Sequence, residues 1–374
     1  MKRGRPGATA AFLPTREQEL LLQACLFEGE DGLAAWRSWQ ASVDFDRLDP
    51  ASVRLLPLLA ERLAKCGVED VRLGAYRGVQ RRTWARNVML FRGAAGVIRR
   101  LRAANVTCMA LKGLVLARSC YDAASLRPMG DFDLLIRMED AEAAFDALEA
   151  AAWRPQAPSQ RPRNAADFAA RASCVYEDPE NPDVSVDLHW RLFWARCSAE
   201  ADEDLWARAA PFSVEAEGCL APSWADMLLH VCAHGARWNG LPPQRWVADS
   251  VTLLNTKAVE WDHLCQQARR WGLGPPLADA LGYLRAAMRA EAPAAVLERL
   301  TRMKTSPIDR LVYASELRPP QRRGLLAATR LHRHIAHEHL GGRGYWSYLQ
   351  AVRAGRSLRA MAGWAADRLR ASLL

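Results

Sequence analysis

An aspartate–phenylalanine–aspartate triplet begins the apolar segment 131–136, and this pattern constrains the chain more than any other. Successive side chains of a β-strand point to opposite faces of the sheet. We therefore predict that Asp131 and Asp133 share one face near the start of a strand, while Phe132 points to the other. Two carboxylates placed in this way offer the hard oxygen ligands that Mg²⁺ (or Mn²⁺) takes, and two such ions align the attacking and leaving oxygens around a phosphorus atom.

A second apolar segment, 183–190, supplies a third carboxylate. Its two valines and its leucine fall on one face of a strand, whereas Ser185, Asp187 and His189 fall on the other. If this strand lies beside the first, Asp187 joins the aspartate pair, where it either binds metal or takes a proton from an acceptor hydroxyl. His189 has two interpretations: a half-buried histidine with a satisfied ring, or a side chain that contacts the nucleotide.

The character of the sequence changes near residues 106 and 222. Helical periodicity dominates before the first point, and amphipathic helices separated by glycine and proline follow the second. Between them, strand-like and helix-like segments alternate, so we predict an α+β protein. Its parts are an N-terminal helical region (1–105), an α/β core (106–220) and a C-terminal helical domain with a basic tail (221–374).

Within the core, short apolar runs and turn residues define the elements. A proline-containing polar stretch at 154–166 is predicted to be a loop. The expected strands are 106–113, 131–136, 173–178, 183–190 and 212–218, and the expected helices are 114–121 and 138–151.

Four segments together resemble a known family. They are MALKGLVLARSCYDAASLRPMGDFDLLI (109–136), VSVDLHW (184–190), LLHVCAHGARW (228–238) and RWVADSVTLL (245–254). They are similar to the bacterial uncharacterised nucleotidyltransferases, which belong to the DNA polymerase β-type nucleotidyltransferase superfamily. Members of this family are sometimes encoded near genes for lasso-peptide or exopolysaccharide biosynthesis. The resemblance covers residues 105–290, about half of the chain.

The resemblance implies a small mixed sheet flanked by helices, with a helical domain appended. It also implies an activity, the metal-dependent transfer of a nucleoside monophosphate from an NTP donor to an acceptor, with release of pyrophosphate. The acceptor is a small molecule, a peptide or a protein that the residues do not identify. By position, Asp131, Asp133 and Asp187 would be the catalytic and metal-binding triad, and Gly113 would lie in the turn that approaches the triphosphate.

One element departs from the superfamily pattern. Where Gly-Gly or Gly-Ser usually binds the triphosphate, this chain has Leu111-Lys112-Gly113, and no serine follows directly. Lys112 is a plausible substitute because an ammonium group acts as a point charge for phosphate oxygens, and Arg127 adds a second cation from the following loop. The departure keeps an alternative open, in which the chain is a catalytically inactive nucleotide- or anion-binding module of the same fold.

The histidines of the C-terminal part have both a structural and a functional interpretation. His230 and His234 are one turn apart on a predicted helix, where they pack between helices or line a cleft opposite the aspartates. The cluster of His332, His334, His337 and His339 is interpreted as a polar helix face rather than as a metal site.

The net charge and the cysteine content indicate which partners the protein binds and in which cellular compartment it lies. The 51 lysines and arginines exceed the 42 aspartates and glutamates by nine, which favours anionic partners. Eleven arginines follow residue 317, so this basic tail is either a solvated helical face or a weak contact with an anionic surface. Nine scattered cysteines without a CxxC pair, together with the absence of a long apolar run, predict a cytoplasmic protein without a transmembrane segment.

Overall fold

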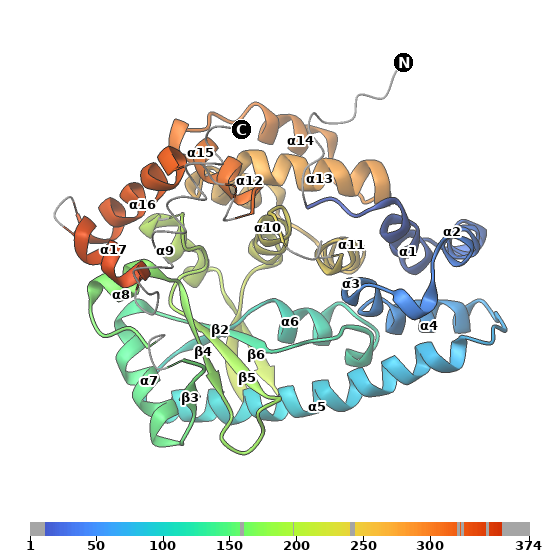
Figure 1. Cartoon of the computed structure of the whole chain (residues 1–374), viewed down its shortest axis with the longest axis horizontal. Coiled ribbons are helices and arrows are strands. Elements are labelled where there is room, and N and C mark those ends of the chain that lie inside the picture. Colours follow the sequence, from blue (N-terminus) through green and yellow to red (C-terminus); the bar gives the residue numbers. More distant parts are fainter. Residues whose placement is uncertain are drawn as a thin grey trace.

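A seven-stranded mixed sheet lies at the centre of the protein, with helices on both of its faces (Figure 1). The computed structural model describes residues 12–157, 161–196, 198–239, 244–319, 322, 325–341 and 344–353. The predicted α+β class is therefore confirmed. The division into three parts at residues 105 and 220 remains a prediction, since one continuous core of buried side chains extends from Phe12 to Leu300 through all three parts.

The strands follow the order β3-β4-β5-β2-β1-β7-β6. β2 runs parallel to β5 and β1 runs parallel to β7, whereas the other neighbours are antiparallel. The bounds are β1 (Cys108–Ala110), β2 (Phe132–Ile136), β3 (Arg154–Pro155), β4 (Ser173–Glu177), β5 (Ser185–His189), β6 (Ala210–Val214) and β7 (Glu217–Ala221).

Two details of the sheet differ from the predictions. The segment 106–113 was expected to be one strand, but β1 ends at Ala110 and helix α6 (Lys112–Ser119) begins two residues later. The Leu111 N–H still donates to the Asp133 carbonyl oxygen, and the chain then leaves the sheet at Lys112, whose φ is 26°. The segment 212–218 is not one strand but the turn of a β-hairpin, in which Glu215 adopts a positive φ of 53°.

The region predicted as a loop, 154–166, also contains regular structure. Its first two residues form the edge strand β3, and helix α8 (Ala165–Ala170) begins where the Asn164 side chain accepts hydrogen bonds from two backbone N–H groups. The other elements of the core are η2 (Ala124–Leu126), η3 (Met138–Asp140), α7 (Ala141–Ala150) and α9 (Ala199–Ala207).

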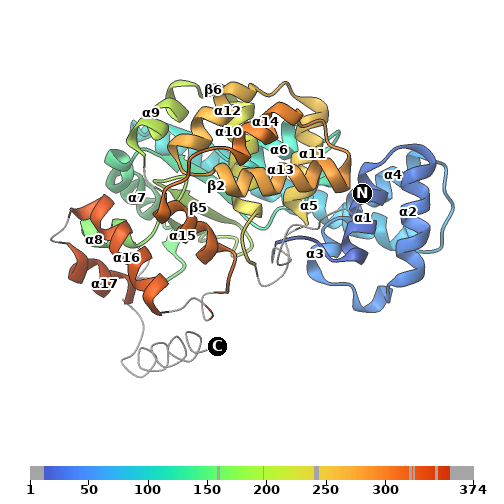
Figure 2. The same cartoon turned by 90° about the horizontal axis from the view of Figure 1, so that it is seen from above.

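The N-terminal helices form one end of the molecule (Figure 2). The first of them begins at a capping box, in which the side chains of Thr15 and Gln18 each bond the backbone of the other residue. The bounds are α1 (Arg16–Leu26), α2 (Gly29–Ser42), η1 (Phe45–Arg47), α3 (Pro50–Val53), α4 (Leu56–Lys65) and α5 (Leu73–Ala103). The longest of them, α5, extends over 31 residues.

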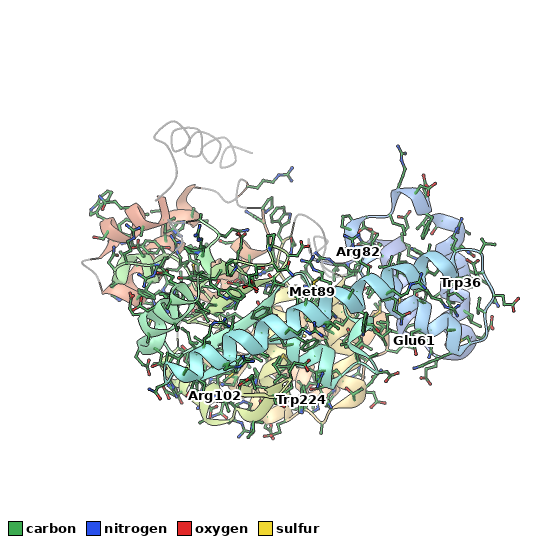
Figure 3. The ribbon with its side chains drawn as sticks, turned by 90° about the horizontal axis from the view of Figure 1, so that it is seen from below. Trp36, Glu61, Arg82, Met89, Arg102 and Trp224 are labelled. Carbon is green, nitrogen blue, oxygen red and sulfur yellow. The ribbon has the colours of Figure 1, made fainter. Side chains whose placement is uncertain are left out.

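Helix α5 runs the length of the molecule beneath the sheet, as the view from below shows (Figure 3). One stripe of its side chains is buried against the core. Its outer face contains exposed arginines, among them Arg82 and Arg102, and the exposed ring of Trp84. Among the described residues, no helix is long and apolar enough to cross a membrane.

The residues after 222 are helical in the described part of the chain, as predicted. Helices α10 to α14 cover the upper side of the sheet, whereas α16 and α17 lie beside α8 at the far end (Figure 2). The bounds are α10 (Trp224–Gly235), α11 (Arg245–Thr256), α12 (Trp261–Arg270), α13 (Gly274–Met288), α14 (Ala294–Thr301), α15 (Pro307–Glu316), α16 (Leu325–Leu340) and α17 (Tyr345–Arg353).

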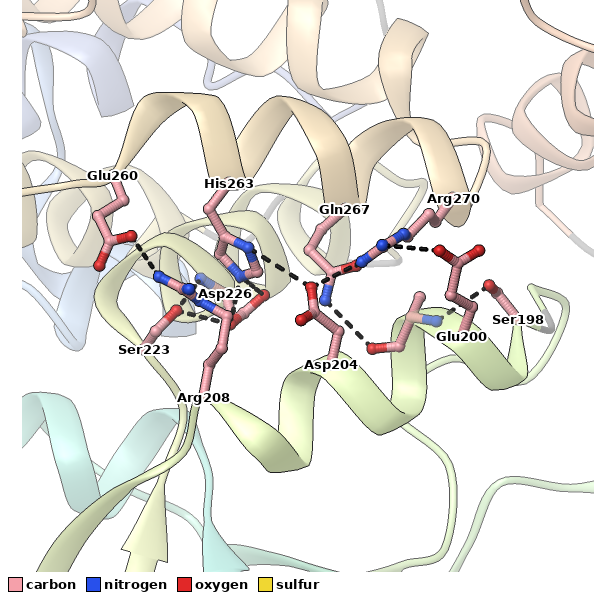
Figure 4. Close-up of polar contacts among 11 residues, drawn as sticks. Ser198, Glu200, Asp204, Arg208, Ser223, Asp226, Glu260, His263, Gln267 and Arg270 are labelled. Atoms are coloured by element: carbon pink, nitrogen blue, oxygen red, sulfur yellow. Dashed lines mark hydrogen bonds and ion pairs between the residues drawn. The ribbon is translucent and has the colours of Figure 1, made fainter.

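A buried polar network fixes α12 against α9 and α10 (Figure 4). The fully buried Asp226 carboxylate accepts a hydrogen bond from Ser223 Oγ at 2.6 Å and lies 2.9 Å from His263 Nε2. Nearby, Gln267 Nε2 donates to the Ala201 carbonyl oxygen at 3.1 Å. These contacts satisfy polar groups that would otherwise be buried without partners, so they determine how the three helices pack.

The basic tail is described only as far as residue 353. The four histidines of the predicted polar helix face lie on α16, where His332 lies 2.8 Å from the Tyr348 hydroxyl, His334 pairs with Glu338 and only His337 is exposed, so the polar face stays a prediction. Residues 354–374, which contain four of the tail's arginines, lie outside the described residues. The contact with an anionic surface therefore stays a prediction.

Candidate functional site

Two predicted aspartates lie directly opposite each other in the sheet. Asp133 of β2 is the register partner of Asp187 of β5, and their neighbours Phe132 and Val186 are also paired. Both apolar side chains are fully buried, so both carboxylates point to the other face. The proposed adjacency of these two strands is thus confirmed.

Asp131 stands one residue before β2 rather than within it. Its side chain still lines the same cavity as Asp133 and Asp187. Burial, followed by the negative charges of Asp133 and Asp187, raises the pKa of Asp131 above its usual range. The three carboxylates therefore repel one another in the absence of a cation.

His189 lies between the two paired aspartates. Its Nε2 atom is 3.1 Å from Asp187 Oδ2 and 3.3 Å from Asp133 Oδ1. Burial opposes the charged form of this imidazole, but Asp187 and Asp133 outweigh the effect and raise the pKa of His189 to about 9. The sequence placed His189 on the correct face, and the structure shows that it contacts the carboxylates themselves.

The donor set of this site fits a divalent cation. Ligand atoms of Asp133, Asp187 and His189 all lie within 4.8 Å of one another. Asp187 Oδ1 and His189 Nδ1 are buried and have no hydrogen-bond partner within the protein. A buried carboxylate oxygen without a partner is costly, and a bound ion or its water would remove that cost.

Lys112 is the first residue of helix α6, and only Leu111 separates it from β1. Its backbone has a positive φ of 26°, a conformation that is strained for a residue with a side chain and that recurs at functional sites. Burial lowers the pKa of the Lys112 ammonium, and the nearby Asp133 carboxylate opposes this effect. The strained backbone places Lys112 beside the carboxylates at the N-terminus of α6, where backbone N–H groups favour an anion.

Gly113 lies in the first turn of α6, and its position is crowded. A Cβ atom there would lie 3.1 Å from Met129 Sδ and 3.3 Å from Arg127 Nη1. Gly113 lines the cavity that contains the aspartates, so the lack of a side chain allows close packing of the Arg127 loop onto the helix.

Arg127 uses two of its three guanidinium nitrogen atoms to bind another side chain. Its Nε and Nη2 atoms each donate to a carboxylate oxygen of Asp249 in α11 at 2.8 Å, and both side chains are about 95% buried. The Tyr121 hydroxyl donates to the same carboxylate at 2.8 Å. Arg127 lines the cavity, yet its predicted contact with phosphate is left to the remaining nitrogen, Nη1.

Two other arginines line this cavity and were not singled out from the sequence. Arg245, at the start of α11, donates from Nη1 to the Pro128 carbonyl oxygen at 3.0 Å. Arg54 follows α3 and is exposed. Arg245 lies within a segment that carried the family resemblance, so a signal existed, whereas nothing near Arg54 in the sequence indicates its place.

The aspartates stand where two cavities meet. The smaller cavity, of about 240 Å³, contains the α6 N-terminus and the basic residues Lys112, Arg54 and Arg245. The larger cavity, of about 540 Å³, extends along β4, β5 and α15. Both are lined by Lys112, Asp133, Asp187, His234 and Asn239.

The larger cavity is partly aromatic. Phe193, Trp194 and Trp238 line it, together with His230 and His234 of α10. The two histidines thus face the site rather than only packing between helices. Burial lowers the pKa of His230 well below its ordinary value, and its Nδ1 atom has no hydrogen-bond partner.

The chain matches a known protein family. Residues 51–289, nearly two thirds of the chain, match the model of a family described as uncharacterised nucleotidyltransferase. The matched range contains all of the predicted site residues and both additional arginines. No curated protein matches the chain.

Proposed function

Because the chain belongs to the uncharacterised nucleotidyltransferase family, we propose that it uses a divalent metal ion to transfer a nucleoside monophosphate from an NTP to an acceptor hydroxyl. The observation that carries the proposal is the pairing of Asp133 with Asp187 on adjacent parallel strands, with Asp131 beside them. Carboxylates grouped around one cavity are the ligands that Mg²⁺ or Mn²⁺ requires.

In the proposed reaction an acceptor oxygen attacks the α-phosphorus of the NTP. The bond from that phosphorus to the bridging oxygen breaks, and pyrophosphate leaves with the electron pair. Asp131, Asp133 and Asp187 would hold the metal, which when bound neutralises charge on the phosphate oxygens. Asp187 is also placed to take the acceptor proton, because it borders the larger cavity as well as the smaller one.

We propose that the two cavities bind different substrates. The smaller cavity combines the Lys112 ammonium, the Arg245 guanidinium and the N-terminus of α6, and all three attract phosphate. We assign the triphosphate to it. The larger cavity has aromatic walls beside charged side chains such as Arg196, Arg237 and Glu316, so we assign to it an acceptor that has both an apolar or aromatic part and polar groups.

The test is transfer from α-labelled NTPs with Mg²⁺ or Mn²⁺, using candidate acceptors and mass spectrometry of the products. Asp133→Asn should lower the rate by at least about 10²-fold, because it removes a charge that aligns the metal. Asp183→Asn is the matched control, since Asp183 precedes the same strand β5 but is 72% exposed. Equal activity of wild type and Asp133→Asn would refute the assignment.

The alternative of an inactive binding module also has an observation in its favour. Arg127, the predicted second phosphate contact, donates two hydrogen bonds to Asp249 instead. The serine that usually follows the glycine of the triphosphate-binding element is also absent. Such a module would show a thermal shift with NTP and metal but no release of pyrophosphate. Pyrophosphate release that depends on Asp133 would exclude it.

A further inference from the structure

We propose that His189 is itself a metal ligand together with Asp133 and Asp187, and that the site therefore prefers Mn²⁺ or a similar first-row ion to Mg²⁺. The inference rests on the proposed metal-dependent function and makes it more specific. It assigns a nitrogen ligand to a site that the family resemblance describes with carboxylates alone.

The distances around His189 are those of neighbouring ligands on one ion. Ligands about 2.1 Å from an ion at right angles to each other lie about 3.0 Å apart. His189 Nε2 lies 3.1 Å from Asp187 Oδ2 and 3.3 Å from Asp133 Oδ1. Each of the three side chains offers one ligand atom within 4.8 Å of the ligand atoms of the other two.

A direct hydrogen bond explains these distances less well. Nε2 carries at most one hydrogen, which cannot point well at two carboxylate oxygens at once. A charged pair of this kind normally closes to about 2.7–2.9 Å, and both separations are longer. A cation located between the three atoms would be coordinated by all of them at once.

The sheet itself holds the three side chains in this arrangement. Asp187 and His189 are two residues apart on β5 and so share a face, and Asp133 is the register partner of Asp187. The His189 side chain is 12% exposed, and its ring lies in the cavity wall beside His230. Regular strands fix such a site more firmly than loops do.

Imidazole changes which ion the site selects. Mg²⁺ takes oxygen ligands almost exclusively, whereas imidazole nitrogen suits first-row transition ions. Asp131 lies outside the group of three ligand atoms and remains available on the side of the smaller cavity. The ion held by His189 would therefore lie next to Asp187, where the larger cavity begins.

The test is pulsed electron paramagnetic resonance of Mn²⁺ bound to the full-length protein, with metal affinities measured by calorimetry. We expect a nitrogen coupling to Mn²⁺ in the wild type that changes character when the histidines carry ¹⁵N. His189→Ala should abolish this coupling and weaken Mn²⁺ binding by about 10–100-fold, while Mg²⁺ binding changes much less. The control His230→Gln removes another buried histidine of the same cavity and should keep the coupling.

A second variant, His189→Asp, replaces nitrogen by oxygen and should shift the preference toward Mg²⁺. The isotope measurement on the wild type needs no variant, so a folding defect does not affect it. Mn²⁺ bound without nitrogen coupling would overturn the role of His189 but leave the metal-dependent function standing. Failure of the wild type to bind any divalent ion, with or without NTP, would overturn both.

Discussion

The buried pair of Arg127 and Asp249 allows a quantitative test of how the site is held together. Two hydrogen bonds of 2.8 Å join the side chains, and each is about 95% buried. Removing one partner leaves an uncompensated buried charge, which costs about 3–5 kcal/mol. We therefore expect Arg127→Met and Asp249→Leu each to lower the free energy of unfolding by that amount.

The double variant should be far more stable than the sum of the single ones. Replacing both charges by apolar groups is nearly neutral, and the Tyr121 hydroxyl that loses its acceptor adds about 1–3 kcal/mol of cost. Urea unfolding followed by tryptophan fluorescence gives the three values needed for the cycle. Single effects below about 1 kcal/mol, or additive ones, would refute the reasoning.

The same double variant tests the predicted contact of Arg127 with phosphate. If Arg127 acts only through Asp249, the folded double variant still binds NTP with metal at nearly the wild-type affinity. If its free Nη1 atom contacts the triphosphate, affinity falls although the protein remains folded. Calorimetric titration with a non-hydrolysable NTP distinguishes the two results.

Three further predictions concern stability. Asp226→Ala should lower the free energy of unfolding by about 1–3 kcal/mol because it leaves His263 Nε2 and Ser223 Oγ without their shared buried hydrogen-bond partner, and denaturant unfolding measures the loss. Gly235→Ala should destabilise by about 1–3 kcal/mol, because its Cβ would lie 2.2 Å from the Trp246 ring, and calorimetry should show a lower Tm. Burial raises the pKa of Asp202 to about 6 in the folded protein, above its unfolded value of 3.8. Between these two pH values the folded protein binds a proton that the unfolded chain has lost, so the free energy of unfolding falls as the pH rises from 3.8 to about 6. Asp202→Asn should remove that loss, so a variant no more stable than wild type at pH 7.5 would contradict the prediction.

The carboxylate pair could be predicted because strand periodicity is a local property. Phe132 separates the two aspartates of the first segment, and polar residues alternate with apolar ones along 183–190, so each strand leaves only one face for its aspartate. The adjacency of the two strands was a hypothesis that no local pattern fixes, and the structure confirms it. The edge strand β3 has only two residues, too few for any periodicity to appear.

The cations of the site were harder to predict because they come from distant parts of the chain. Arg54 precedes the sheet and has no sequence pattern that distinguishes it from other arginines of a basic protein, whereas Arg245 follows the sheet and is marked only by the family resemblance of its segment. The binding of Arg127 by Asp249 joins residues 122 positions apart. Whether a predicted cation is available or already paired is decided by such contacts, not by its neighbours in the sequence.

The arrangement of charges explains why the fold tolerates two carboxylates directly opposite each other. Like charges at paired positions of a sheet are destabilising, and burial increases the cost. Here Lys112 and His189 stand beside the pair, and together they hold the pKa of Asp133 well below its usual range despite its burial. Asp131 has less of this compensation, and its pKa is raised. The protein alone thus neutralises only part of the negative charge, and the charge that remains favours the binding of a cation at this site.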